Sequence, residues 1–321
     1  MTHPLLLPAL DGRDPLGFLA ALGVLCLLTD HQPIHPVALS FDPPTATAVL
    51  HSQHTDITQV TAALGEIIDH MPAGAVIPGL PAGFPAPMRQ KGGEPNRVPR
   101  LDYRTLITTH GGDGKLDPLL RWIAVLLTDL AVDDQKRAVL TPYIAPVAKQ
   151  SLRGFFDNPL TATRAQPDRL HEALTNWRRI ADVTGENLDH RALRPGVDQP
   201  DGKSLPAGVP GATWLATMAL PLLRLTGDGT TRSATLWHRA PDNTTELMIW
   251  PIWRHPLDVH AVQAILEHPA LQPKFRNGTT CIRLTPLRPL GVFHAAAAHR
   301  QRQPALRYNE VLTPMPLSVI E

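Results

Sequence analysis

An apolar segment near the start of the chain constrains the fold more than any other feature, because it is hydrophobic on every side. Residues 16–28 read LGFLAALGVLCLL, so large apolar side chains lie all the way around a helix of about 3.6 residues per turn. Asp14 can cap the first turn, and Pro15 suits the first helical position, where a missing N–H breaks no hydrogen bond. Gly17 and Gly23 weaken a helix by about 1 kcal/mol each, which indicates that another backbone approaches closely there. The segment predicts a central helix that other elements cover on nearly every side.

Length and composition point to a globular protein. The chain has 321 residues, enough for one large or two ordinary domains, and is 43% hydrophobic and 18% charged. The apolar segment is shorter than the roughly 18 residues that a membrane span requires, and it lacks the basic region and cleavage site of a signal peptide. We therefore expect a cytoplasmic protein without a membrane partner. Cys26 and Cys281 are the only cysteines, which argues against a disulfide scaffold or a cysteine-based zinc site.

Turn residues and hydrophobic periodicity divide the rest of the chain into short elements. The patterns predict helices at 56–68, 119–131, 167–180, 214–225 and 258–267, and strands at 37–41, 45–50, 138–144, 233–238, 246–250 and 279–285. We expect an α+β fold that is mostly helical, with small antiparallel sheets, in two lobes. Residues 185–209 are rich in proline, glycine and charge, and they are the predicted linker between an N-terminal lobe at 1–184 and a C-terminal lobe at 210–321.

Residues 71–104 contain seven prolines and five glycines, a spacing that excludes a stable helix. The stretch predicts a long irregular loop without the apolar periodicity needed to dock on the protein, and loops of this length are usually functional or disordered. Its second half is basic. We expect Arg89, Lys91, Arg97 and Arg100 to form a mobile clamp on nucleic acid, with Tyr103 and Arg104 exposed beside them.

From His268 to Asn309 the chain runs 42 residues without an aspartate or glutamate, although its net charge is only +1. Such a concentration of positive charge favours contact with a polyanion, and the planar fork of arginine suits phosphate. Acidic residues from elsewhere in the fold could also neutralise it. The stretch carries Lys274, Arg276, Arg283, Arg288, Arg300, Arg302 and Arg307. We expect an exposed track along a nucleic-acid backbone, formed by Arg283, Arg288, Arg300, Arg302, Arg307 and Tyr308.

No motif in the sequence gives a positive argument for catalysis. Residues 196–204 resemble a phosphate-binding loop, but five residues separate the two glycines where four are needed. His51 and His54, with His31 and His35 nearby, could gather a metal ion, although they lack the spacing and carboxylate partner of a hydrolytic site. We therefore expect no catalytic residue, metal site or cofactor. A metal-dependent hydrolase or nuclease that uses His51 and His54 is the alternative.

Two tryptophans lie close together in the C-terminal half, in the segment Trp250-Pro-Ile-Trp253-Arg254. The indole rings could stack on bases while Arg254 pairs with phosphate. A core position is favoured, because tryptophan is highly buried on average and the segment joins a predicted strand to a capped helix.

Several segments together resemble a known family. They are residues 10–25 (LDGRDPLGFLAALGVL), the Thr141-Pro-Tyr segment that leads to Gln150-Ser-Leu, residues 210–216 with Leu220-Pro-Leu, and residues 250–257 (WPIWRHPL). In these segments the chain resembles CRISPR-associated proteins of the type I-G (formerly I-U) systems, in particular their Cascade large-subunit-like members.

The resemblance implies a binding role within an RNA-guided complex, in which guide pairing supplies sequence specificity. The implied partners are guide RNA, target DNA or both, together with other CRISPR effector subunits. An alternative is a protein-only scaffold whose basic tail docks on acidic subunits.

Overall fold

The computed structural model of the chain describes residues 2–85, 98–99, 103–105, 107–108, 118–133, 136–144, 151–192, 206–242, 245–276, 278–302 and 310–320. Its helices are α1 (Pro15–His31), α2 (Ile57–Asp69), α4 (Pro118–Leu126), α5 (Leu152–Arg164), α6 (Asp168–Thr175), α7 (Pro210–Thr217) and α8 (Val259–Leu266). Its strands are β1 (His3–Asp11), β2 (Ala38–Phe41), β3 (Thr47–Ser52), β4 (Val98–Pro99), β5 (Leu127–Val132), β6 (Arg137–Leu140), β7 (Ile180–Ala181), β8 (Ala207–Gly208), β9 (Leu225–Gly227), β10 (Arg232–Ala234), β11 (Trp237–Arg239), β12 (Glu246–Trp253), β13 (Lys274–Arg276), β14 (Thr279–Arg283), β15 (Val292–Arg302), β16 (Glu310–Met315) and β17 (Ser318–Ile320).

The expectation of a mostly helical protein is wrong. Of the described residues, 36% are in helices and 31% in strands, so the fold is mixed α/β. The strands form several small sheets, of which the largest has the order β11-β12-β15-β16. The pairings between the described strands are antiparallel, except that β14 and β17 run parallel. Strands β1 and β15, the two longest, lie outside the predicted strands.

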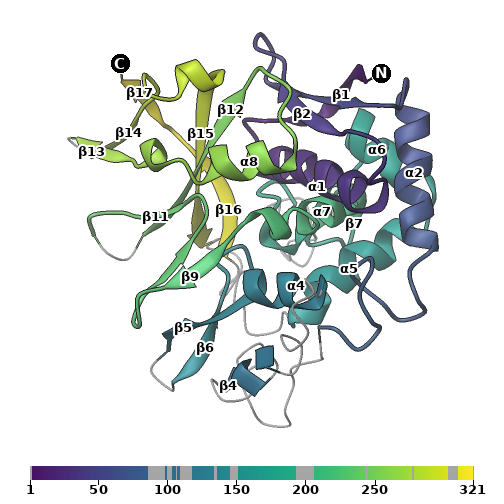
Figure 1. Ribbon diagram of the computed structural model, residues 1–321, viewed down its shortest axis with the longest axis horizontal. Helices are drawn as coiled ribbons and strands as arrows, with labels where there is room; N and C mark the ends of the chain where they lie inside the picture. The colour runs from purple at the N-terminus through teal and green to yellow at the C-terminus, as the bar shows by residue number, and fades with distance from the viewer. Residues whose placement is uncertain are drawn as a thin grey trace, which may run out of the picture.

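Helix α1 forms the centre of the molecule (Figure 1), with β1 and β2 on one side, α7 on another and the sheet of β12, β15 and β16 beyond. The Asp14 carboxylate caps it by accepting hydrogen bonds from the backbone N–H groups of Leu16 and Gly17, at 2.9 and 3.2 Å. Every residue from Pro15 to Leu28 is buried. The predicted all-round burial of this helix is therefore confirmed.

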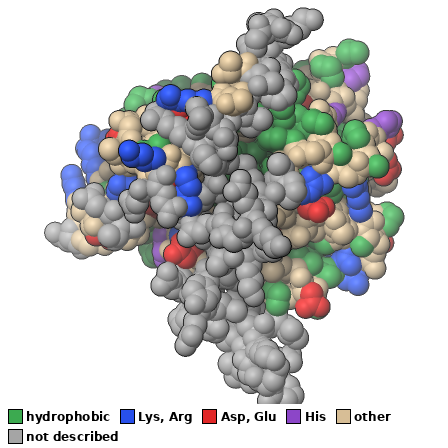
Figure 2. Space-filling view, turned by 90° about the horizontal axis from the view of Figure 1, so that it is seen from below, with side chains coloured by type: hydrophobic (Ala, Val, Ile, Leu, Met, Phe, Trp, Pro, Cys, Tyr) green, Lys and Arg blue, Asp and Glu red, His purple; other side chains and the backbone are tan. Residues whose placement is uncertain are grey.

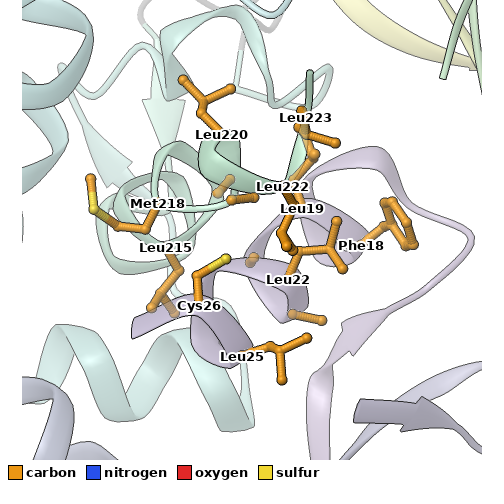
Figure 3. Packing of buried hydrophobic residues seen from close by; sticks show 14 of the residues in the cluster. Phe18, Leu19, Leu22, Leu25, Cys26, Leu215, Met218, Leu220, Leu222 and Leu223 are labelled. Atoms are coloured by element: carbon orange, nitrogen blue, oxygen red, sulfur yellow. The ribbon is translucent and has the colours of Figure 1, made fainter. Parts of the chain in front are cut away.

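The two glycines of α1 lie where other backbones approach the helix. A Cβ atom at Gly23 would lie 1.8 Å from the carbonyl oxygen of Leu215 in α7, and one at Gly17 would lie 2.4 Å from the carbonyl oxygen of Asp11. Figure 3 shows the apolar side chains of α1 meeting those of α7 and of the 3₁₀ turn η2 (Leu220–Leu222) at this crossing. The close contact explains why glycine, a poor helix former, lies inside the most buried helix.

The N-terminal sheet has the order β1-β3-β2, with β1 at its edge. The strands predicted at 37–41 and 45–50 are confirmed as β2 and β3, which pair as a hairpin, and the helix predicted at 56–68 is confirmed as α2, which Asp56 caps. Strand β1 contains Pro4 and Pro8, which cannot donate to a ladder of hydrogen bonds. Its edge position and a register shift between Leu7 and Asp11 accommodate them.

The tryptophans of β12 tie the C-terminal half of the chain to the N-terminal half. Trp250 and Trp253 are both fully buried. The indole Nε1–H of Trp250 donates to the carbonyl oxygen of Gly12 at 2.7 Å, and that of Trp253 donates to the carbonyl oxygen of Leu39 at 2.8 Å. Their predicted core position is confirmed, and no face of either ring is open to a base.

Two other expectations need correction. The helix expected at 119–131 ends at Leu126, and the chain continues as β5, where Leu127 and Thr128 pair with Leu140 and Val139 of β6. Pairing with a neighbouring strand overrides the helical pattern there. The first part of the stretch 71–104 is also packed rather than loose, since Val76, Ile77 and Leu80 are buried.

The described part of the predicted linker, residues 185–192 and 206–209, also contributes to the interior. Asp189 is 1% exposed, and its carboxylate accepts two hydrogen bonds from Arg179, at 2.7 and 3.2 Å. Buried apolar residues on both sides of this segment belong to one cluster. The division into two lobes stays a prediction. Among the described residues, no helix is both long and apolar enough to cross a bilayer.

Candidate nucleic-acid interface

The small sheet β13-β14-β17 places three cations of the acid-free stretch on one face. Paired residues on neighbouring strands share a face, and successive residues alternate between faces. Lys274 lies opposite Cys281, and Arg276 opposite Thr279. Arg283 lies two residues beyond Cys281 on β14, so it projects on the same side. We call this side, with Lys274, Arg276 and Arg283, the basic face.

The opposite side of the same sheet is mainly apolar and is buried at its centre. It carries Phe275, Thr280, Ile282 and Val319, of which Thr280 and Ile282 are buried and Val319 is 39% exposed. On β14, Ile282 is fully buried on this side, whereas Arg283 is exposed on the other side and Cys281 beside it is 5% exposed. The exposed side chains of Lys274, Arg276 and Arg283 therefore mark the basic face.

The cations of the basic face are exposed, and the three strands contribute no acidic residue. Within the described residues, no ion pair involves Lys274, Arg276 or Arg283. By contrast, exposed arginines elsewhere pair with carboxylates, such as Arg13 with Asp11 at 2.9 Å. Figure 2 shows Lys and Arg side chains gathered at its left end, the end at which Figure 1 places β13 and β14. An unneutralised, solvent-facing group of cations is the arrangement that attracts phosphate.

Two further arginines of the predicted track lie beyond the basic face. Arg288 is exposed in the 3₁₀ turn η4 (Arg288–Leu290), which follows β14. Arg302 ends β15 and pairs with Glu310 of β16 in the ladder. The predicted track is therefore not one continuous row on a single strand.

Arg300 is turned inward, which contradicts its predicted exposure. Its guanidinium is buried and donates hydrogen bonds to the carbonyl oxygens of Pro142, Tyr143, Asn187 and Glu310, at 2.8 to 3.2 Å. Burial, with Arg232 as a second cause, lowers the pKa of Arg300 to about 10, so it stays charged at neutral pH. Because β15 alternates between two faces, a position in the acid-free stretch does not decide which way an arginine points. Arg300 holds three segments of the protein together and presents nothing to a ligand.

Tyr103 also departs from the prediction, since it is buried with only 7% exposure. Its hydroxyl donates to the carbonyl oxygen of Leu127 at 3.0 Å, and burial raises its pKa to about 12. Arg104 is exposed as expected, and its Nε donates to the Asp129 carboxylate at 2.6 Å. The buried ring of Tyr103 leaves no surface for a base to stack on.

The remaining members of the predicted site lie outside the described residues. They are Arg89, Lys91, Arg97 and Arg100 of the predicted clamp, and Arg307 and Tyr308 of the predicted track.

The histidines of the alternative metal site each have a local hydrogen-bond partner. His51 Nε2 lies 2.8 Å from Ser40 Oγ, and His54 Nε2 lies 3.1 Å from Gln32 Oε1. Burial lowers the pKa of both histidines. Across the part of the chain that the structure describes, no group of three or more His, Cys, Asp or Glu residues is arranged to hold a metal ion.

Lys274 and Arg276 belong to the acid-free stretch but not to the predicted track, so only Arg283 of the three cations on the basic face was predicted. A signal for them exists in the chain. Asn277-Gly278 is a typical two-residue hairpin turn, and Gly278 has a φ of 75°. A hairpin at this position pairs the two flanking strands and brings Arg276 and Lys274 beside β14.

Comparison with known proteins adds no relative. No protein-family model matches the chain, and no curated protein matches it at a significant level. The resemblance to type I-G CRISPR-associated proteins thus rests on the sequence segments alone.

Proposed function

We propose that this chain binds nucleic acid through the basic face of β13, β14 and β17, as a non-catalytic subunit of an RNA-guided CRISPR interference complex in the cytoplasm. The observation that carries the binding is a set of three exposed cations on one side of a sheet whose strands contain no acid, none of them in an ion pair with another described residue. Placement in a CRISPR complex, with guide RNA or target DNA and other effector subunits as partners, comes from the sequence resemblance.

Contacts of this kind read the phosphate backbone and carry no sequence information. Lysine and arginine on an open face grip phosphates and position the ligand, whereas sequence is read by contacts to base edges or by guide pairing. The proposed role is therefore to hold a strand that guide pairing selects.

Salt dependence of binding tests the proposal. We expect Lys274→Gln, Arg276→Gln and Arg283→Gln together to weaken binding to a labelled strand of about 20 nucleotides. The slope of log affinity against log salt should fall by about 2 on a single strand or about 3 on duplex DNA. The matched control carries Arg13→Gln, Arg121→Gln and Arg178→Gln, which remove the same charge from cations that are paired with acids elsewhere.

The control should keep the slope of the unsubstituted protein. If both triple variants lose the same affinity, the effect comes from net charge alone, and the assignment of binding to the basic face is wrong. If the slope is unchanged while assembly with other subunits weakens, the basic face is a protein interface and the scaffold reading replaces the proposal.

A further inference from the structure

A pocket of about 360 Å³ opens beside the basic face, between β10, β11, the start of β12 and β13. Its walls include Trp237, His238 and Arg239 from β11, Glu246 from β12, and Gln272 and Phe275 from the approach to β13 and from β13 itself. The volume is near the lower end of the range for small-molecule sites, roughly 300–1,000 Å³. It suits one flat, nucleotide-sized group rather than a duplex.

Two aromatic side chains give the pocket flat apolar surfaces. Trp237 is held in place by the edge of the Tyr143 ring, with centroids 5.6 Å apart, and by the Arg300 guanidinium, 5.8 Å from its centroid. Phe275 is half-buried and is not part of the hydrophobic core cluster. The ring of Phe275 therefore lines the pocket without packing in the core cluster, and its face can stack on a ligand.

The polar groups of the pocket include both donors and acceptors. Arg232 Nη2 donates to the Glu246 carboxylate at 2.5 Å, and its Nη1 donates to the carbonyl oxygen of Leu140 at 3.0 Å, so these two side chains are fixed. Arg239 lies opposite Glu246 in the ladder and is exposed. Burial lowers the pKa of His238 to about 4, and its Nε2 is buried without a hydrogen-bond partner among the described residues. Mixed donors and acceptors beside aromatic faces match the edges of a nucleobase.

The pocket and the basic face share one strand. Phe275 lines the pocket from one side of β13, while its neighbours Lys274 and Arg276 project from the other side. Because β13 is the edge strand of its sheet, only a single strand, about 5 Å wide, separates the two sites. A nucleic-acid strand that follows the basic face could therefore place a base in the pocket by crossing that edge.

We propose that this pocket accepts one unstacked base of a single-stranded nucleic acid whose phosphates lie on the basic face. The inference rests on the proposed function and adds a preference for single strands, since a paired base cannot leave its stack without cost.

Two ligands of equal length separate the base subsite from backbone binding. One is an oligothymidylate of about 15 nucleotides, and the other is an abasic strand with the same phosphates, both at one salt concentration. Phe275→Leu keeps an apolar side chain but removes the ring face. We expect this change to weaken the affinity for oligothymidylate by roughly 5- to 150-fold, which corresponds to the loss of one base–aromatic stack. The affinity for the abasic strand and the slope of log affinity against log salt should stay unchanged. Phe293→Leu, at a half-buried phenylalanine outside the pocket, is the control and should change neither.

Fluorescence of Trp237 gives a second measurement. We expect oligothymidylate, but not the abasic strand, to quench tryptophan emission, and Trp237→Phe to remove most of that quenching while Trp177→Phe does not. Equal affinity of the unsubstituted protein for both ligands, or equal losses for both ligands in Phe275→Leu, would overturn the base subsite. Failure of the unsubstituted protein to bind even the abasic strand would instead overturn the proposed function itself.

Discussion

Arg300 and Arg283 lie in the same acid-free stretch, yet they have opposite roles. Arg283 meets solvent on the basic face, whereas Arg300 satisfies four buried backbone carbonyl groups. A carbonyl acceptor carries no formal charge, so a count of acidic and basic residues in the sequence cannot reveal the partners of Arg300. The distinction depends on strand register, which long-range packing sets.

We expect Arg300→Met to lower the free energy of unfolding by about 3 kcal/mol or more, because it leaves several buried carbonyl groups without donors. Arg283→Met, the matched change on the basic face, should alter it by less than about 1 kcal/mol. Urea denaturation followed by circular dichroism measures both. A stability loss for Arg300→Met as small as that for Arg283→Met would contradict the assignment of Arg300 as an internal clasp.

At the scale of elements, the crossing of α1 and α7 depends on one missing side chain. A Cβ atom at Gly23 would overlap the carbonyl oxygen of Leu215, and backbone cannot move aside as a flexible side chain can. Gly65 in α2 offers a control, because no atom lies within 4 Å of a Cβ built there.

We therefore expect Gly23→Ala and Gly65→Ala to shift the free energy of unfolding in opposite directions. The first should destabilise the protein by about 1 to 3 kcal/mol or more through overpacking. The second should stabilise it by about 0.5 to 1 kcal/mol, since alanine is the better helix former. Thermal unfolding of the two variants measures both changes in stability. A Gly23→Ala protein as stable as the unsubstituted protein would mean that α1 and α7 pack less closely than described.

Helices that begin at an aspartate cap were predicted from the sequence, whereas α5, which Ser151 caps, was missed. Elements fixed by distant partners were also missed or misplaced. The helices α1, α2 and α8 each begin at an aspartate whose carboxylate accepts from the first turn, and all three were predicted. Strand β1 was missed because its prolines argue against a strand, and only pairing with β3 allows them. The predicted C-terminal end of α4 was wrong, because the residues that follow the helix pair with β6 in a sheet.

The same limit applies to the candidate site. The absence of acid from 268–309 located the positive charge correctly along the chain. It could not separate the outward cations Lys274 and Arg276 from the inward Arg300, because side-chain direction on a strand depends on register. The pocket had no sequence signal at all, since its walls come from β10, β11, β12 and β13 and meet only in the folded protein.

At the scale of the whole molecule, the core joins the two predicted lobes. Helix α1 is covered by α7, and Trp250 and Trp253 bond to the backbone of the N-terminal half. Strands β11, β13 and β14, which contribute to the pocket and the basic face, lie toward one end of the molecule, away from α1 (Figure 1). Substitutions at the interface should therefore change binding with little effect on stability.

Separate expression of residues 1–209 and 210–321 tests the predicted division. Each fragment would expose apolar surface that the other covers, so we expect neither to give a cooperative thermal transition alone. The intact chain, measured in the same buffer, is the control. Cooperative unfolding of either fragment would establish two independently folding lobes.

The central position of α1 also has a consequence for synthesis on the ribosome. The α7 backbone that covers Gly23 is made about 190 residues after the helix itself. At a translation rate of roughly 5 to 20 residues per second, the most apolar segment of the chain waits about 10 to 40 seconds for its cover. During that interval a nascent chain offers chaperones, or other nascent chains, a helix with no polar side to shield it, so the yield of this protein in a cell depends on what reaches α1 first.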